Sequence, residues 1–237
     1  MFFFTTKDLP ECDELMQKYT EGNVLAHSTI MFRREIANKI VEDIQSNGGI
    51  LSLDDLENYE AKDSKVLEGS YRPGHFKGVS HVVHNLFYLT KPSSAYFGLK
   101  DIQQFAIIQK MNETTGLNID LIGCPTIRSK EGLALSSRNE KLSNEGLQQA
   151  LMIIKTLRFV EKNKKQYNPV DLKNKAIELF ENGDLKLEYL DIVNAKTFKQ
   201  IESFEEPSVC CIAAYCENTR LIDNILLESV LSNENIK

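Results

Sequence analysis

The chain has no tryptophan, only four histidines and no apolar run of the length that a membrane-spanning helix needs. An excess of basic residues is also absent, since 34 acidic side chains outnumber 28 basic ones and the formal charge is −6. This balance argues against a nucleic-acid-binding surface. We therefore expect neither a membrane nor a nucleic acid as a partner.

Secretion signals and metal-binding cysteine patterns are missing as well. The apolar opening Met1–Phe4 is too short for a signal peptide and lacks a basic segment before it, so a first strand is predicted there. The five cysteines show no C-x-x-C spacing, and Cys210, Cys211 and Cys216 lie in an apolar run. We expect reduced thiols that behave as small buried hydrophobes in a cytoplasmic protein, and no zinc site.

The apolar spacing predicts an α/β fold. A strand at 94–97, a helix with Ile102, Phe105 and Ile108 on its inner face, and a strand at 118–123 follow one another. This order predicts parallel strands with a right-handed crossover, as in an incomplete Rossmann-like nucleotide-binding domain. A small α+β domain is predicted after it, with helices at 142–162 and 170–182 and strands at 187–193, 209–215 and 220–226.

Three regions follow from these patterns. An atypical N-terminal segment takes up 1–65, where helices are predicted at 34–47 and from Ser52 towards Tyr59. A partial α/β binding domain is expected at 66–140, and it includes a predicted helix over 79–89. The C-terminal α+β domain, at 141–237, is expected to act as a lid.

Two stretches carry the parts of a phosphate-binding site. Tyr96–Gln104 places a glycine, a lysine and an aspartate where a strand gives way to a helix, and Gly132–Asn139 places two adjacent hydroxyls beside an arginine. Phosphate sites use free backbone N–H groups at helix N-termini together with fixed cations. The two stretches therefore predict an ATP site at one edge of the parallel sheet.

Further motifs flank these stretches, and from Val66 onward they occur in the order V-L-E-G-S-Y-R-P-G-H-F-K-G-V, Y-F-G-L-K-D-I-Q-Q, C-P-T-I-R, G-L-A-L-S-S-R-N, L-E-Y-L-D-I-V and T-R-L-I-D-N. In these motifs the chain resembles the pantothenate synthetase (pantoate–β-alanine ligase) family. The resemblance implies that the carboxylate of pantoate attacks the α-phosphate of ATP, and that β-alanine then displaces AMP from the pantoyl adenylate. It also implies Mg²⁺ with the ATP, and a homodimer.

The same resemblance implies the site residues. The phosphate-binding and catalytic groups are Lys100, Ser136, Ser137 and Arg138. The other ATP-binding positions are Gly98, Leu99, Asp101, Ile127, which contacts adenine through its backbone, and Leu135. Gln104 is expected to bind pantoate. Leu99 stands where the family commonly has glutamate, a change of little consequence if that position acts through its backbone.

The first 65 residues depart from the family pattern. The motif P-T-M-G-A-L-H-x-G-H, whose histidines contact the phosphates, and the pantoate-binding V-N-P-x-Q-F stretch are both absent. Residues 33–61 instead resemble a segment of γ-glutamyltransferase that lies outside that family's catalytic site. We expect a missing strand and crossover helices, and weak activity or none, in a chain that looks like a chimera. A gene fusion, a deletion with a frame change and an assembly artefact would each produce this pattern.

Two other functions have some support in parts of the sequence. A non-catalytic module that binds ATP or pantoate, or that pairs with another subunit, would share the same motifs. A γ-glutamyl hydrolase or transferase would need an N-terminal nucleophile, and that family's catalytic threonine segment is absent. His81 and His84 share a predicted helix face, but a metal site would need further ligands.

Overall fold

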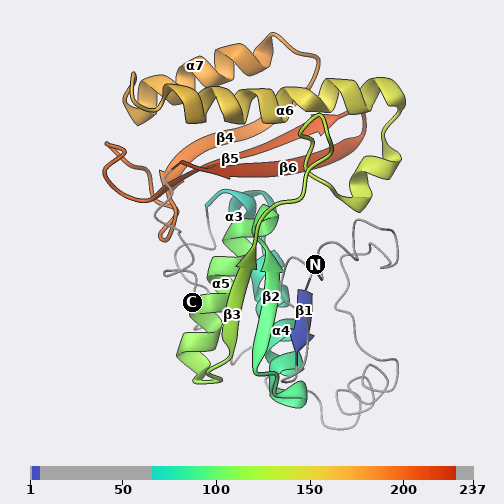
Figure 1. Ribbon diagram of the computed structural model, residues 1–237, viewed down its shortest axis with the longest axis vertical. Helices are drawn as coiled ribbons and strands as arrows, with labels where there is room; N and C mark the ends of the chain where they lie inside the picture. The colour runs from blue at the N-terminus through green and yellow to red at the C-terminus, as the bar shows by residue number, and fades with distance from the viewer. Residues whose placement is uncertain (1, 6–65, 228–237) are drawn as a thin grey trace. The chain divides into compact units, whose positions relative to one another are not determined.

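The computed structural model describes residues 2–5 and 66–227 (Figure 1). The chain forms two compact units, which divide between Cys124 and Pro125. The helices predicted at 34–47 and after Ser52, and the segment that resembles γ-glutamyltransferase, lie outside the described residues. No helix in the described part combines the length and the hydropathy of a membrane span.

The first unit contains a three-stranded sheet in the order β1-β2-β3, with β1 at Phe2–Thr5, β2 at Ser94–Gly98 and β3 at Asp120–Cys124. Strands β2 and β3 are parallel, and Ala95 lies opposite Leu121. Helix α5 (Ile102–Thr115) connects them, which confirms the predicted β-α-β crossover. Strand β1 confirms the first strand predicted at the N-terminus and runs antiparallel to β2, a direction that the sequence pattern did not predict.

Helices α3 (Glu68–Tyr71), α4 (His75–Thr90) and α5 accompany this sheet. Helices α4 and α5 bury their apolar residues in one core with β2. Phe97 of β2 contacts both helices. The Phe97 ring lies 6.3 Å from the ring of Phe87 on α4 and 5.8 Å from that of Phe105 on α5. Helix α5 ends at Gly116, whose φ of 67° is the left-handed conformation that commonly closes a helix.

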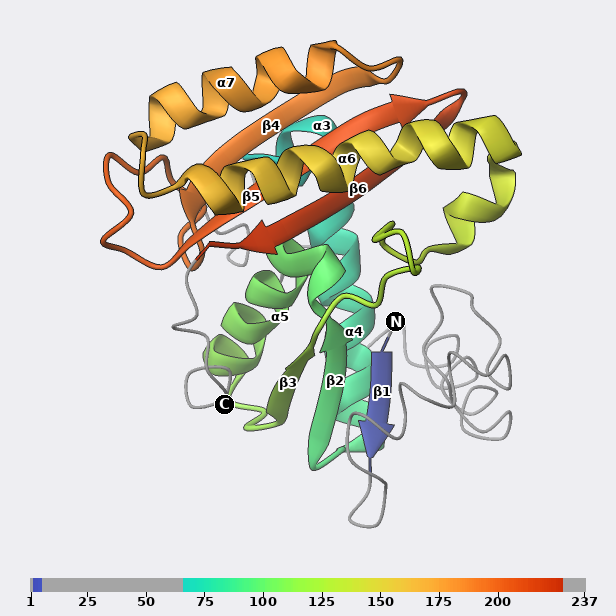
Figure 2. The ribbon, with the colours of Figure 1, turned by 45° about the horizontal axis from the view of Figure 1, so that its top comes forward.

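The second unit is an antiparallel sheet with two helices on one face, as Figures 1 and 2 show. Its strands are β4 (Lys186–Asn194), β5 (Ser208–Cys216) and β6 (Thr219–Leu226), and its helices are α6 (Asn144–Asn163) and α7 (Pro169–Glu181). Ser143 caps α6 by accepting a hydrogen bond from the Gly146 amide at 2.9 Å, and Asn168 caps α7 through the Asp171 amide at 2.9 Å. The predicted α+β pattern is confirmed.

Strand β5 is the centre of the second core, since it is buried along almost its whole length. Cys210, Cys211 and Cys216 are buried free thiols, as predicted. Burial raises the pKa of the Cys210 thiol well above its usual value, so this side chain acts as a small hydrophobe.

The segment that joins the two units packs within the second one. Leu133 and Leu142 belong to the same buried cluster as α6 and β5, and Arg128 forms an ion pair with Asp223 on β6. The compact division at Cys124 therefore lies ahead of the boundary expected after residue 140. These long-range contacts are the physical reason, since composition alone does not reveal a partner on β6.

Candidate nucleotide site

The first predicted stretch forms the end of β2 and the start of α5. Gly98 is the last residue of β2, and Leu99, Lys100 and Asp101 form the 3₁₀ turn η3 (Leu99–Asp101) that leads into the helix. The carboxyl end of a parallel strand is where α/β proteins bind their ligands. Lys100 and Asp101 are half-buried there.

Gly98 has no internal reason to be glycine. Its φ of −68° and ψ of 124° are an ordinary extended conformation, and an added Cβ would meet no atom within 4 Å. A side chain at this position would instead occupy open space. This geometry suits a place where a ligand approaches the backbone closely.

Leu99 has a structural side chain. It is 8% exposed and belongs to the core with Phe97 and Phe105. It can therefore contact a nucleotide through its backbone alone, which explains how leucine can stand where the family commonly has glutamate.

The two adjacent glutamines differ in their surroundings. Gln103 is 3% exposed, donates to the Val66 carbonyl at 2.9 Å and accepts from the Glu68 amide at 3.1 Å. Gln104 is half-buried, and its side chain has no hydrogen-bond partner in the described part of the chain. The carboxylate of Asp101 has none there either. Gln103 therefore anchors α3, whereas the Gln104 amide makes no hydrogen bond within the described part of the chain.

The second predicted stretch belongs to a short hairpin in the second unit. Arg128 and Ala134 form an isolated antiparallel bridge, and the Leu135 amide donates to the Ile127 carbonyl at 2.9 Å. The turn passes through Gly132, whose φ of 106° few other residues adopt. Leu135 is exposed and Ile127 is half-buried.

The serine pair and the arginine follow this hairpin. Ser136 caps the 3₁₀ helix η4 (Ser137–Lys141) by accepting a hydrogen bond from the Arg138 amide at 3.2 Å. Arg138 Nη1 donates to the Arg220 carbonyl on β6 at 3.1 Å. Ser137 makes no side-chain hydrogen bond within residues 66–227. Of the two serines, Ser136 therefore caps the helix, and the Ser137 hydroxyl makes no hydrogen bond within the described residues.

The structure groups the predicted residues in two sets. Gly98, Leu99, Lys100, Asp101 and Gln104 lie together in the first unit, and Ile127, Leu135, Ser136, Ser137 and Arg138 lie together in the second. Sequence reasoning gave no role to Arg128 or Asp223, whose ion pair joins the 127–135 hairpin to β6. The available signal was the single charged residue of C-P-T-I-R and the aspartate of T-R-L-I-D-N.

The histidine pair on α4 belongs to a polar cluster in which His84 and Asn85 are buried and His81 is half-buried. His84 is 6% exposed, and burial lowers the pKa of its imidazole, with a smaller contribution from the charge of His81. The Asn85 amide lies 3.3 Å from Nε2 of His81. Within residues 2–5 and 66–227, no group of three or more His, Cys, Asp and Glu side chains could hold a metal ion.

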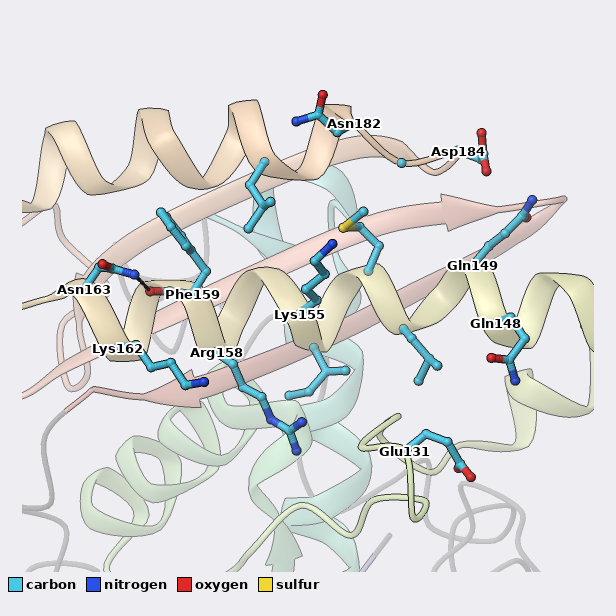
Figure 3. Close-up of a pocket in the computed structure, with 15 residues that line it drawn as sticks. Glu131, Gln148, Gln149, Lys155, Arg158, Phe159, Lys162, Asn163, Asn182 and Asp184 are labelled. Carbon is cyan, nitrogen blue, oxygen red and sulfur yellow. Dashed lines mark hydrogen bonds between the residues drawn. The ribbon is translucent and has the colours of Figure 1, made fainter.

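A groove of about 750 Å³ lies along α6, and none of the predicted site residues lines it (Figure 3). Lys155, Arg158 and Lys162 stand on it at helical spacing, with Glu131 and Asp184 at its borders. All three cations are exposed, so this groove has the character of a solvated helix face.

Known proteins match this arrangement. Residues 52–226 match the family described as Pantoate-beta-alanine ligase. The pantothenate synthetase of Cytophaga hutchinsonii is 43% identical over 168 residues, which are 69% of this chain and 59% of that protein. That of Bacteroides fragilis is 42% identical over 164 residues, which are 68% and 58% of the two chains.

Solved structures of pantothenate synthetases are also similar to this chain. The pantothenate synthetase of Thermus thermophilus has a TM-score of 0.71 at 27% identity, over 92% of this chain and 75% of that one. Pantoate-beta-alanine ligase from Francisella tularensis, solved with Beta-gamma ATP and Beta-alanine, has a TM-score of 0.54 at 26% identity, over 90% and 74%.

The fold is therefore that of a class of ligases in which an α/β unit with parallel strands is followed by a small unit with an antiparallel sheet. Within this class, the chain belongs to the pantoate-beta-alanine ligase family, as its motifs predicted. The match begins at residue 52 and so includes part of the segment likened to γ-glutamyltransferase. The chain spans less than two thirds of the length of these relatives, 59% and 58%.

Proposed function

We propose that this chain binds ATP and pantoate and catalyses, at a reduced rate, the ATP-dependent condensation of pantoate with β-alanine. The observation that carries the proposal is the end of β2. There, the position of a Gly98 Cβ is open space, and Lys100 and Asp101 in the following turn are half-buried. The Gln104 side chain on α5 has no hydrogen-bond partner among the described residues. Family membership supplies the substrates.

The proposed reaction has two balanced steps. A carboxylate oxygen of pantoate attacks the α-phosphorus of ATP, and pyrophosphate leaves to give pantoyl adenylate. The amine of β-alanine then attacks the acyl carbon, loses a proton and displaces AMP. Neither step needs a covalent bond to the protein, so its residues contribute by positioning and by neutralising charge.

Each residue has a proposed role in that scheme. The ammonium of Lys100 neutralises charge on the phosphates, while Gln104 binds the pantoate. The Ser137 hydroxyl and the remaining guanidinium donors of Arg138 are the proposed phosphate contacts of the 132–139 stretch, because Ser136 and one Arg138 nitrogen already have internal partners. The Ile127 amide is proposed to meet the adenine.

Mg²⁺ is proposed to accompany the ATP. Protein sites usually bind this ion through phosphates, water and one or two carboxylates. Asp101 provides such a carboxylate without a hydrogen-bond partner among the described residues, so the donor set fits. The ion would neutralise charge on the phosphates.

We further propose that the chain is cytoplasmic and acts as a homodimer, as the resemblance implies. Light scattering would test the oligomeric state.

The reduced rate follows from the absent H-x-G-H motif. Loss of one preorganised contact to developing charge typically slows catalysis by about 10²–10³-fold. A pantoate-dependent exchange of pyrophosphate into ATP well below that of a full-length relative is expected. An exchange rate equal to the relative's would contradict the impairment.

A binding module without catalysis is the second candidate, and the same uncommitted groups favour it. Calorimetry with ATP separates the two functions. Binding with no exchange supports the module, and binding with slow exchange supports the ligase. Absence of ATP binding would overturn both.

A further inference from the structure

Arg128 and Asp223 form a partly buried, bidentate ion pair that joins the 127–135 hairpin to β6. Arg128 Nη1 lies 2.6 Å from Oδ2 of Asp223, and Nη2 lies 3.0 Å from Oδ1. The Asp223 side chain is 2% exposed and that of Arg128 is 21% exposed. A bidentate arginine–carboxylate pair fixes orientation as well as distance, because both groups are planar.

The pair is also hydrogen-bonded to the backbone around it. Arg128 donates to the Gly132 carbonyl at 3.2 Å and to the Asn224 carbonyl at 3.2 Å. Asp223 accepts from the Asn224 amide at 2.8 Å. The guanidinium thus joins the tip of the 127–135 hairpin to β6, and the carboxylate is held in place by its own strand.

The far end of the stretch is attached to the same strand. Arg138 donates to the carbonyl of Arg220, and Arg220 in turn pairs with Glu188 on β4, with Nε 2.8 Å from the carboxylate. Asn139 closes the stretch by donating to the Ala134 carbonyl at 3.0 Å. Residues 220 and 223 of β6 therefore hold both ends of the segment that contains the serine pair.

We propose that Asp223 and Arg128 are positioning residues that set the shape of the 127–138 segment for contact with the nucleotide. The proposal rests on the proposed function, since it assumes that this segment binds ATP. Replacing a buried ion pair by apolar groups often leaves stability unchanged, so stability alone is a weak reason for its presence. Preorganisation is a stronger one, because a donor contributes most when it is already aimed at the phosphate.

The test uses the full chain, with Asp223→Asn and Arg128→Lys as variants. Asp223→Asn removes the charge and keeps the size, whereas Arg128→Lys keeps the charge and removes the fork. The control is Asp191→Asn, which breaks the Lys173–Asp191 pair between α7 and β4 in the same unit. Two quantities are measured: hydrogen exchange of the Ser129, Gly132 and Leu135 amides, which make the hairpin's hydrogen bonds, and the Kd for ATP.

Both variants are expected to speed exchange at these three amides and to raise the Kd for ATP, each by about tenfold, as loss of about 1.4 kcal/mol would do. Amides of the β4–β5 ladder should keep their protection, and the control should leave the hairpin and the Kd unchanged. Unchanged hairpin exchange in Arg128→Lys would overturn the proposal, as would an equal loss of protection throughout the unit. If the unsubstituted chain binds no ATP, the proposed function fails, and hairpin exchange alone still decides whether the pair shapes the segment.

Discussion

The two sets of site residues differ in how their polar groups are satisfied. In the first unit, Asp101 and Gln104 have no hydrogen-bond partner among the described residues, and Gly98 adjoins open space. In the second unit, Ser136 and Arg138 already bond to the protein itself. The first set lies at the end of a strand, and the second lies in a loop whose side chains bond to the protein itself.

This difference teaches where specificity and precision originate. A strand end is held in place by its sheet and does not depend on hydrogen bonds of its own side chains. A loop lacks the hydrogen bonds of a sheet, so several of its own polar groups must bond internally to fix its shape. Only then do the remaining polar groups have a defined orientation. Substitutions in the first unit should therefore change binding directly, and many in the second should act through loop shape.

The largest expected effect is a loss of stability when a buried ring is removed, and it tests whether the two cores unfold independently. Phe97→Ala and Phe180→Ala each remove a fully buried ring, which typically lowers the free energy of unfolding by about 3–5 kcal/mol. Because the two residues lie in separate buried units, each should first reduce hydrogen-exchange protection in its own unit. Val170→Ala, at a side chain 62% exposed, should change stability by at most about 0.5 kcal/mol. Equal losses in both units would show that the cores unfold together.

The second-largest expected effect is a loss of activity on substitution of Lys100, in the proposed nucleotide site. Lys100→Ala should slow pantoate-dependent exchange of pyrophosphate by about 10²–10³-fold, since it removes a preorganised charge from the phosphates. Lys110→Ala, on the exposed side of α5 and paired only weakly with Glu113 at 3.5 Å, is the matched control and should leave the rate unchanged. Equal rates for the two variants would remove Lys100 from the site.

Local pattern predicted the elements better than their pairing. The spacing of Ile102, Phe105 and Ile108 defined α5, and Pro92 ended the helix before it, because these signals act within a few residues. The antiparallel direction of β1 was not predicted, since a lone strand does not encode which way it will pair. The Arg128–Asp223 pair joins residues 95 positions apart, and one sequence gives no sign of such a contact.

Residue roles within the predicted site were only partly accessible. The sequence motif marks both glutamines, but only the fold shows that Gln103 bonds to Val66 and Glu68 and Gln104 does not. Ser136 and Ser137 were likewise equivalent until the start of η4 made one of them a cap. In both pairs, a backbone partner that is invisible in the sequence decided the outcome.

A smaller effect separates binding from folding at Gly98. Gly98→Ala should leave stability unchanged or slightly raise it, because the conformation is extended and the space is open. The Kd for ATP should rise by about tenfold, the equivalent of about 1.4 kcal/mol, if the backbone here contacts the nucleotide. Gly78→Ala, on α4 with the same open space, is the control and should add about 0.5–1 kcal/mol of stability without changing the Kd. An unchanged Kd for Gly98→Ala would mean that the glycine has no ligand beside it.

The smallest expected effect is a pH dependence confined to the first unit. Burial lowers the pKa of His84 in the folded chain, so the unfolded chain, with an ordinary histidine pKa of about 6.5, binds more protons below that pH. Stability of the first unit should therefore be fully present above pH 6.5 and decline as the pH falls towards the lowered value. All four histidines precede residue 125, so hydrogen-exchange protection in the second unit should stay flat between about pH 7 and 5.5 after correction for the intrinsic exchange rate. His84→Leu should abolish the slope in the first unit, and a slope that persists in this variant would assign it to another group.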